Sequence, residues 1–91
     1  MNILQRPFRV FKKHLRAKHK LFFHNEIILY EHEKDVFCFG YFFFEKEKGV
    51  YGQIDVQKKI IVYEVSEYKR TQGRGFHTIS PINIIYEQIT Y

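Results

Sequence analysis

Hydrophobic positions recur at two different periods along the 91-residue chain, one in the first segment and another in the rest. In the first segment the apolar positions fall within about 60° of one another on a helical wheel at 100° per residue; they are Leu4, Phe8, Phe11, Leu15 and Phe22. Adjacent like residues, such as Lys12 with Lys13, exclude the alternation of a strand. We therefore predict a helix over about residues 7–23. Pro7 would be its first residue, where a missing N–H is harmless.

After this segment the pattern becomes typical of short strands. Residues 50–56 alternate between apolar and polar positions, and residues 36–44 are apolar on both sides, as a central strand would be. The predicted strands cover about residues 26–32, 36–44, 50–56, 60–68 and 82–90. Residues 69–75 are predicted to form a polar loop, and residues 76–80 a short strand that Pro81 interrupts.

These elements predict a single domain of the α+β class over residues 1–91. Its N-terminal amphipathic helix would pack on one face of a four- to five-stranded antiparallel sheet, arranged as a meander. In such a two-layered domain, the second face of the sheet is either solvated or covered by a partner.

Charge is distributed unevenly along this framework. Residues 1–24 carry a net charge of +7, residues 25–67 a charge of −4 and residues 68–91 a charge of +2, which together give the overall +5. Two basic segments flank an acidic middle, and this asymmetry favours a polyanionic partner or a charged membrane surface.

The strongest candidate site is a row of cations on the predicted helix: Arg9, Lys13, Arg16 and Lys20. The row would extend over about 16 Å at 1.5 Å per residue, with neighbouring cations spaced to contact successive phosphates. No acid lies between them to form ion pairs along the helix. The alternative is a solvated helix face whose charges only confer solubility.

A second basic element, with Lys69, Arg70 and Arg74, contains glycines that would allow close approach of a phosphate.

Aromatic residues in segment 36–44 offer a second candidate surface. Its odd-numbered positions share one face of the strand, and its even-numbered positions share the other. One set must pack beneath the helix, and the other could form an interface or a base-stacking surface. We take the odd set as the candidate interface: Phe37, Phe39, Tyr41 and Phe43.

The sequence gives little support for catalysis or metal binding. His14, His19 and His24 are five residues apart, a spacing that turns each by about 140° on a helix and excludes the i,i+4 pair of a helical zinc site. His77, near three cations, could act in RNA cleavage, but no second acid–base group accompanies it. We expect a non-enzymatic protein with no catalytic residues, no cofactor and no metal.

The cysteine content, the length of apolar runs and the amino-acid composition bear on where the protein acts. Cys38 is the single cysteine and indicates no oxidising compartment, and the longest apolar run in residues 1–24 is too short for a transmembrane segment. We expect a cytoplasmic protein. The low alanine content, with abundant lysine, isoleucine and phenylalanine, favours a low-GC genome such as that of a phage or other mobile element, so the cytoplasm would be that of the host.

The first functional hypothesis is a nucleic-acid-binding protein, for DNA or RNA, that contacts the phosphate backbone through the helix. The alternative is a protein-interaction module or inhibitor. It would dock on an acidic surface of a host protein or form a homodimer through an aromatic sheet face.

Overall fold

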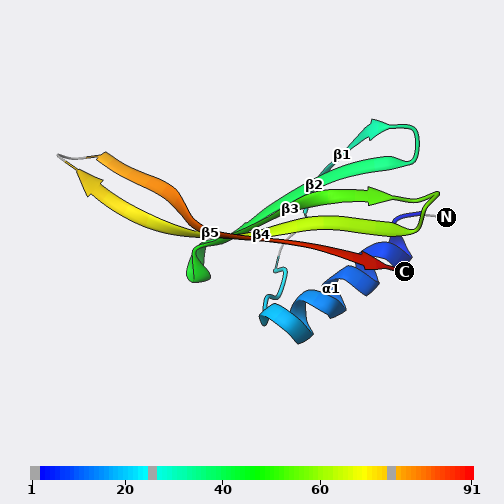
Figure 1. Cartoon of the computed structure of the whole chain (residues 1–91), viewed down its shortest axis with the longest axis horizontal. Helices are drawn as coiled ribbons and strands as arrows, with labels where there is room; N and C mark the ends of the chain where they lie inside the picture. Colours follow the sequence, from blue (N-terminus) through cyan, green and yellow to red (C-terminus); the bar gives the residue numbers. More distant parts are fainter. Residues whose placement is uncertain (1–2, 25–26, 74–75) are drawn as a thin grey trace.

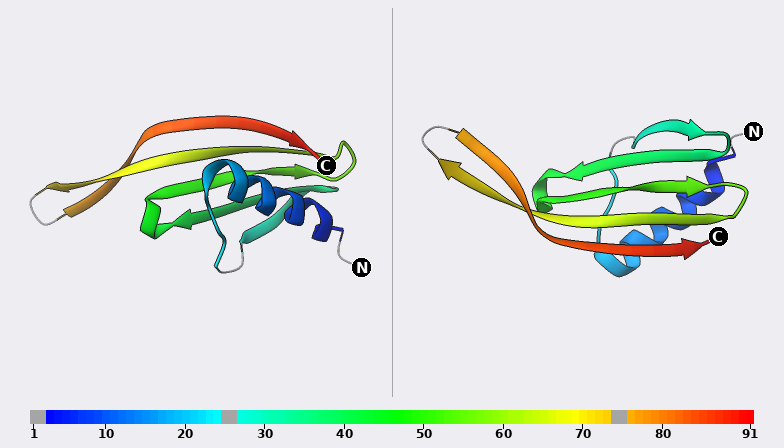
Figure 2. Two further views of the ribbon diagram at one scale, coloured as in Figure 1. Left: turned by 90° about the horizontal axis from the view of Figure 1, so that it is seen from below. Right: turned by 45° about the horizontal axis from the view of Figure 1, so that its top comes forward.

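The structure is a computed structural model that describes residues 3–24, 27–73 and 76–91, with side chains described outside 70–80. One helix, α1 (Gln5–His19), precedes five strands and a short 3-10 turn, η1 (Phe44–Lys46). The strands are β1 (Ile28–Glu33), β2 (Val36–Phe43), β3 (Lys48–Asp55), β4 (Ile60–Gly73) and β5 (Phe76–Thr90). They form one sheet in the order β1-β2-β3-β4-β5, antiparallel throughout, and α1 lies across one of its faces (Figure 1; Figure 2). The predicted fold class is confirmed.

Helix α1 is shorter at its C-terminal end than the sequence pattern indicates. It ends where Lys20 adopts the left-handed conformation, with φ of 58°, and the Leu21 amide donates a hydrogen bond to the Leu15 carbonyl at 3.3 Å. This turn buries the Leu21 side chain in the core and leaves Phe22 about half exposed. The prediction that Phe22 continues the apolar face of a helix reaching residue 23 was therefore wrong. Pro7 lies in the first turn, two residues after the first helical residue, and is buried.

The pair β4–β5 forms a long hairpin that projects beyond the other strands as an arm (Figure 1; Figure 2). Residues 69–73, predicted as part of a loop, continue β4 and pair with β5, as in Lys69 with Ser80 and Gly73 with Phe76. Pro81 does not interrupt β5. It lies opposite Tyr68, where the register shifts, in a strand at the edge of the sheet. A bulge in an edge strand is a position where the missing N–H of proline is tolerated.

The core lies between α1 and the sheet. The N-cap residue Leu4 and the helical residues Phe11 and Leu15 are almost fully buried in it. Strands β3 and β4 contribute Val50, Ile54, Ile61, Tyr63 and Val65. Aromatic rings make up its centre: the Phe11 ring lies 4.9 Å from the Phe39 ring and 5.0 Å from the Tyr63 ring, both edge to face. The opposite face of the sheet has no second layer in the described chain (Figure 2).

Candidate nucleic-acid interface

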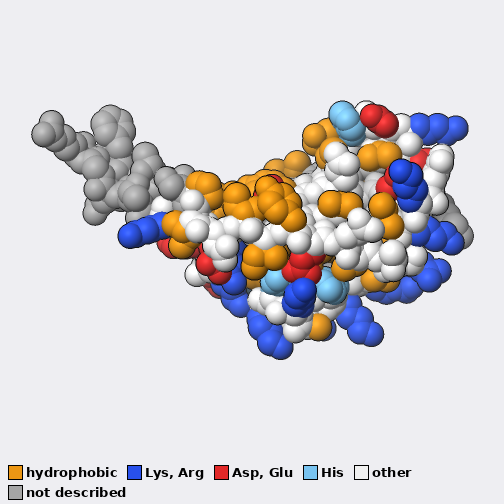
Figure 3. Space-filling model, in the orientation of Figure 1, with side chains coloured by type: hydrophobic (Ala, Val, Ile, Leu, Met, Phe, Trp, Pro, Cys, Tyr) orange, Lys and Arg blue, Asp and Glu red, His pale blue; other side chains and the backbone are white. Residues whose placement is uncertain are grey.

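The outward side of α1 presents the predicted row of cations to solvent. The row consists of Arg9, Lys13, Arg16 and Lys20, all of them exposed. The inward packing of Phe11 and Leu15 fixes this orientation for the three cations within α1, because residues on one face of a helix recur every three or four positions. Lys20 follows the last helical residue as the C-cap. Among the described residues, none of the four cations forms an ion pair with an acid. Lys and Arg side chains gather below the sheet in Figure 3, on the side where Figure 1 places α1. We call these four residues the cationic face.

The second basic element is not brought beside the cationic face. Lys69 is exposed on the arm, which points away from α1 in both ribbon views (Figure 1; Figure 2). The backbone of Arg70 belongs to the same arm, within β4, while its side chain lies outside the described residues. Arg74 also lies outside them, as does the side chain of His77.

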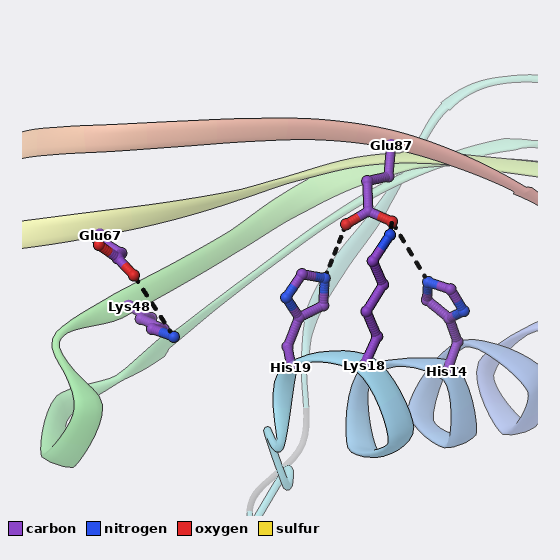
Figure 4. Close-up of polar contacts among 6 residues, drawn as sticks. All are labelled: His14, Lys18, His19, Lys48, Glu67 and Glu87. Atoms are coloured by element: carbon purple, nitrogen blue, oxygen red, sulfur yellow. Dashed lines mark hydrogen bonds and ion pairs between the residues drawn. The ribbon is translucent and has the colours of Figure 1, made fainter.

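A buried carboxylate fastens α1 to the sheet on the inward side of the helix. Glu87, whose side chain is 12% exposed, accepts a hydrogen bond from Nζ of Lys18 at 2.6 Å, and its Oε1 lies 2.8 Å from Nε2 of His19 (Figure 4). Nε2 of His14 lies 3.6 Å from Oε2, buried and without a hydrogen bond among the described residues. The Tyr63 hydroxyl beside this group is also buried and makes no hydrogen bond of normal geometry there.

The ionisation of this group follows from its surroundings. Burial raises the pKa of Glu87, but the hydrogen bonds from Lys18 and His19 outweigh it and lower the pKa to about 2. Burial also raises the pKa of Tyr63, and the negative charge of Glu87 adds to this shift. Glu87 is therefore ionised at neutral pH, and its contacts run between α1 and β5 rather than toward a ligand. We assign this cluster a structural role.

The sequence pattern did not reveal this cluster. The five-residue spacing of His14 and His19 suggested that they point in different directions, yet both rings reach Glu87 (Figure 4). The available signal was in β5, where Glu87 alternates with Ile85 and Ile89 in the row that faces the helix. A charge in an inward row requires cationic partners on the element that covers it.

The predicted aromatic interface faces α1 instead of solvent. Phe39 and Phe43 are buried in the core, and Phe37 and Tyr41 pack against it. Their placement corrects the choice of the odd-numbered set. The reason for the error is that both sets in β2 are apolar, so alternation alone could not decide which one the helix covers.

The opposite face, which we call the open face, carries the even-numbered set and its neighbours. Its exposed large side chains include Ile28, Tyr30, Tyr51, Val62, Ile84 and Tyr86. A shallow hollow of about 630 Å³ lies on it. Among the described residues, the lining of this hollow includes one acid, Glu64, and no Lys or Arg.

A second, smaller hollow lies where the segment after α1 meets η1. It measures about 340 Å³ and is lined mainly by aromatic rings from the two sides, among them Phe22, Phe42 and Phe44. Lys46 belongs to its lining, and the guanidinium carbon of Arg16 lies 5.4 Å from the centre of the Phe22 ring. We call it the aromatic hollow.

The described residues also bear on metal binding and on membrane crossing. In the part of the chain that the structure describes, no three His, Cys, Asp or Glu side chains are grouped so as to hold a metal ion. None of the helices described there has both the length and the apolar character that a bilayer crossing requires.

Comparisons of the chain with protein-family models, with curated proteins and with solved structures return no match. A functional proposal therefore depends on the geometry of the chain itself.

Proposed function

We propose that the protein is a small, non-enzymatic nucleic-acid-binding protein that contacts the phosphate backbone through the cationic face of α1. The observation that carries the proposal is that Arg9, Lys13, Arg16 and Lys20 are exposed together and are unpaired with acids among the described residues. The three cations within α1 lie roughly 4.5 to 6 Å apart along the helix axis, and Lys20 follows at the C-cap. This spacing suits a row of phosphates.

The contrast between Lys18 and this row supports the proposal. Lys18 is the helix cation that the fold uses, since it binds Glu87 and holds α1 on β5. The four residues of the cationic face have no such task, and a soluble helix would usually interleave acids with them to form i,i+4 pairs. Lys69 and Arg70 are secondary in this proposal because the arm points away from α1. Arg74 keeps a secondary role on sequence grounds alone.

The affinity of the cationic face for nucleic acid should fall as the salt concentration rises. A protein that neutralises four phosphates loses affinity with a slope of about −3.6 in log K against log salt on duplex DNA and about −2.8 on a single strand, or roughly 150-fold and roughly 50-fold between 50 and 200 mM. We assign no residue of the cationic face to base recognition. Binding there would therefore be independent of the nucleic-acid sequence.

The test is a double charge reversal, Arg9→Glu with Lys13→Glu, measured by fluorescence anisotropy on unrelated oligonucleotides. We expect the variant to lose at least 10-fold in affinity on every sequence, and its salt slope to flatten by about 2, because two phosphate contacts are lost. The matched control is Lys34→Glu with Lys58→Glu, which changes the net charge equally at exposed strand turns. Unchanged affinity in the helix variant, or an equal loss in the control, would overturn the proposal.

The open face supports a second candidate function, a protein-interaction module that forms a homodimer. Six large apolar or aromatic side chains are exposed there, and a two-layered domain leaves such a face for a partner to cover. The described lining of the hollow on it contains no Lys or Arg, which argues against a polyanion at that position. Size-exclusion chromatography with light scattering is the test. A dimer that binds neither DNA nor RNA would favour this candidate, and a monomer would count against it.

A further inference from the structure

The aromatic hollow lies at the point where the cationic face ends. Lys20 is the last residue of the cationic face, and its backbone carbonyl accepts a hydrogen bond from Nζ of Lys46 at 2.6 Å. Lys46 in turn belongs to the lining of the hollow. Arg16, one turn earlier, lies over the Phe22 ring at 5.4 Å. A strand whose phosphates follow the helix would therefore reach the hollow without leaving the basic surface.

The rings of the hollow are available to a ligand. Phe22 is 48% exposed and Phe44 is 70% exposed, although phenylalanine is among the residues most often buried. The Phe44 ring packs edge to face on Phe42, with ring centres 4.9 Å apart, and this contact holds it in place. Two exposed aromatic rings beside cations that form no ion pair with an acid among the described residues are the combination that single-strand-binding proteins use for base stacking.

The size of the hollow restricts what enters it. At about 340 Å³ it lies at the small end of ligand pockets, which span roughly 300–1,000 Å³. It suits one flat ring system rather than an extended apolar segment. Among the described residues, its lining holds one acid, Glu45, and one Lys or Arg, Lys46, which are neighbours in η1.

The open face is a weaker place for a base. It presents Tyr30, Tyr51 and Tyr86 as stacking surfaces, but its hollow has Glu64 and no Lys or Arg in the described lining. A base stacked there would leave its phosphates without positive partners, whereas at the aromatic hollow Arg16 and Lys20 are adjacent. Phosphate contacts supply most of the sequence-independent affinity.

We propose that the ligand is single-stranded nucleic acid, with one unstacked base in the aromatic hollow against Phe22 and Phe44 while the adjoining phosphates lie along Arg16 and Lys20. A duplex cannot use the hollow, because the faces of its bases are stacked on one another. This inference rests on the proposed function and specifies its ligand.

The experiment compares three labelled probes of about 12 nucleotides, within the usual site sizes for such proteins. They are a single strand of mixed sequence, the same sequence as a duplex, and an abasic strand of the same length that has phosphates but no bases. The variant is Phe22→Leu with Phe44→Leu, which keeps apolar side chains and removes the rings. The matched control is Tyr51→Leu with Tyr86→Leu, which removes two exposed rings from the open face.

We expect the unmodified protein to bind the single strand more tightly than either other probe. The Phe22 and Phe44 variant should lose roughly 5- to 150-fold on the single strand, as expected for the loss of one stacked base, with an unchanged salt slope. Its affinity for the duplex and the abasic strand should stay within about twofold, because the phosphate contacts remain. The Tyr51 and Tyr86 variant should bind all three probes normally.

The outcomes separate this inference from the proposed function. Equal binding of single strand and duplex by the unmodified protein would overturn the inference and leave the phosphate-binding function standing. So would an equal loss on all three probes in the Phe22 and Phe44 variant, or a loss of single-strand preference in the Tyr51 and Tyr86 variant. If no probe binds at all, the proposed function itself fails.

Discussion

The two faces of the sheet carry similar residues but differ in burial, because α1 covers only one of them. On the covered face, Ile61 and Tyr63 of β4 are almost completely buried beneath α1, while on the open face their neighbour Val62 is 44% exposed. Both faces are apolar enough to form a core. What distinguishes the covered face is its fit to the helix, through interlocking aromatic rings and the contacts of Glu87. The same kind of substitution should therefore have different effects on the two faces.

The largest difference is expected for the removal of an aromatic ring. Phe11→Ala deletes a fully buried ring that contacts Phe39 and Tyr63, and we expect it to lower the free energy of unfolding by about 3 to 5 kcal/mol. Tyr86→Ala on the open face removes a side chain that is 73% exposed and should cost less than about 1 kcal/mol in the monomer. Urea unfolding followed by circular dichroism measures both. Comparable losses would show that the open face is buried in solution.

A smaller difference is expected for two glycines on neighbouring strands. A Cβ added to Gly52 on the covered face would clash with the Val62 carbonyl oxygen and would lie 2.8 Å from the Phe39 ring, so the backbone must move. A Cβ added to Gly40 on the open face would meet the Tyr51 ring at 3.0 Å, and this exposed ring can turn away. We expect Gly52→Ala to cost about 3 kcal/mol, and Gly40→Ala less than about 1 kcal/mol. Equal costs in the same unfolding measurement would mean that the covered face adapts as easily as the open one.

Local patterns in the sequence were sufficient for the fold class. The helical period of the first segment and the short alternating segments after it predicted a helix on an antiparallel meander, because these periods depend on each element alone. Segment ends that depend on tertiary packing were not predicted. Helix α1 stops at His19 because Leu21 is buried, and the polar residues of β4 after Lys69 extend the strand because β5 pairs with them.

The candidate site was predictable in part for the same reason. The exposure of Arg9, Lys13, Arg16 and Lys20 followed from the amphipathic pattern. The aromatic hollow did not, since it brings Phe22 together with Phe44, residues from two elements whose proximity depends on the turn after α1. The sequence alone did not distinguish Lys18 from the other helix cations, because its partner Glu87 comes from a distant strand.

The smallest expected effect is a loss of unfolding free energy at low pH. It tests whether Glu87 helps to hold the helix on the covered face. The pKa of Glu87 is lowered in the folded state to about 2, below its ordinary value of 4.5, chiefly because Lys18 and His19 outweigh the effect of burial. A carboxylate with a depressed pKa contributes stability above its unfolded pKa and loses it as the pH falls toward the folded value. The contribution of Glu87 should therefore be complete near pH 7 and decline between about pH 5 and pH 2.

Glu87→Gln separates this contribution from that of the other acids. Between pH 7 and pH 3 we expect the unmodified protein to lose roughly 2 kcal/mol more unfolding free energy than the variant, because the glutamine side chain does not titrate and so removes the contribution of the Glu87 carboxylate. Glu64→Gln, on the open face, should keep the full acid sensitivity, since its carboxylate has no contact with α1 among the described contacts. Urea titrations at each pH give these differences. Parallel acid sensitivity in all three proteins would mean that the carboxylate of Glu87 does not fasten the helix, and that apolar packing alone chooses which face of the sheet is covered.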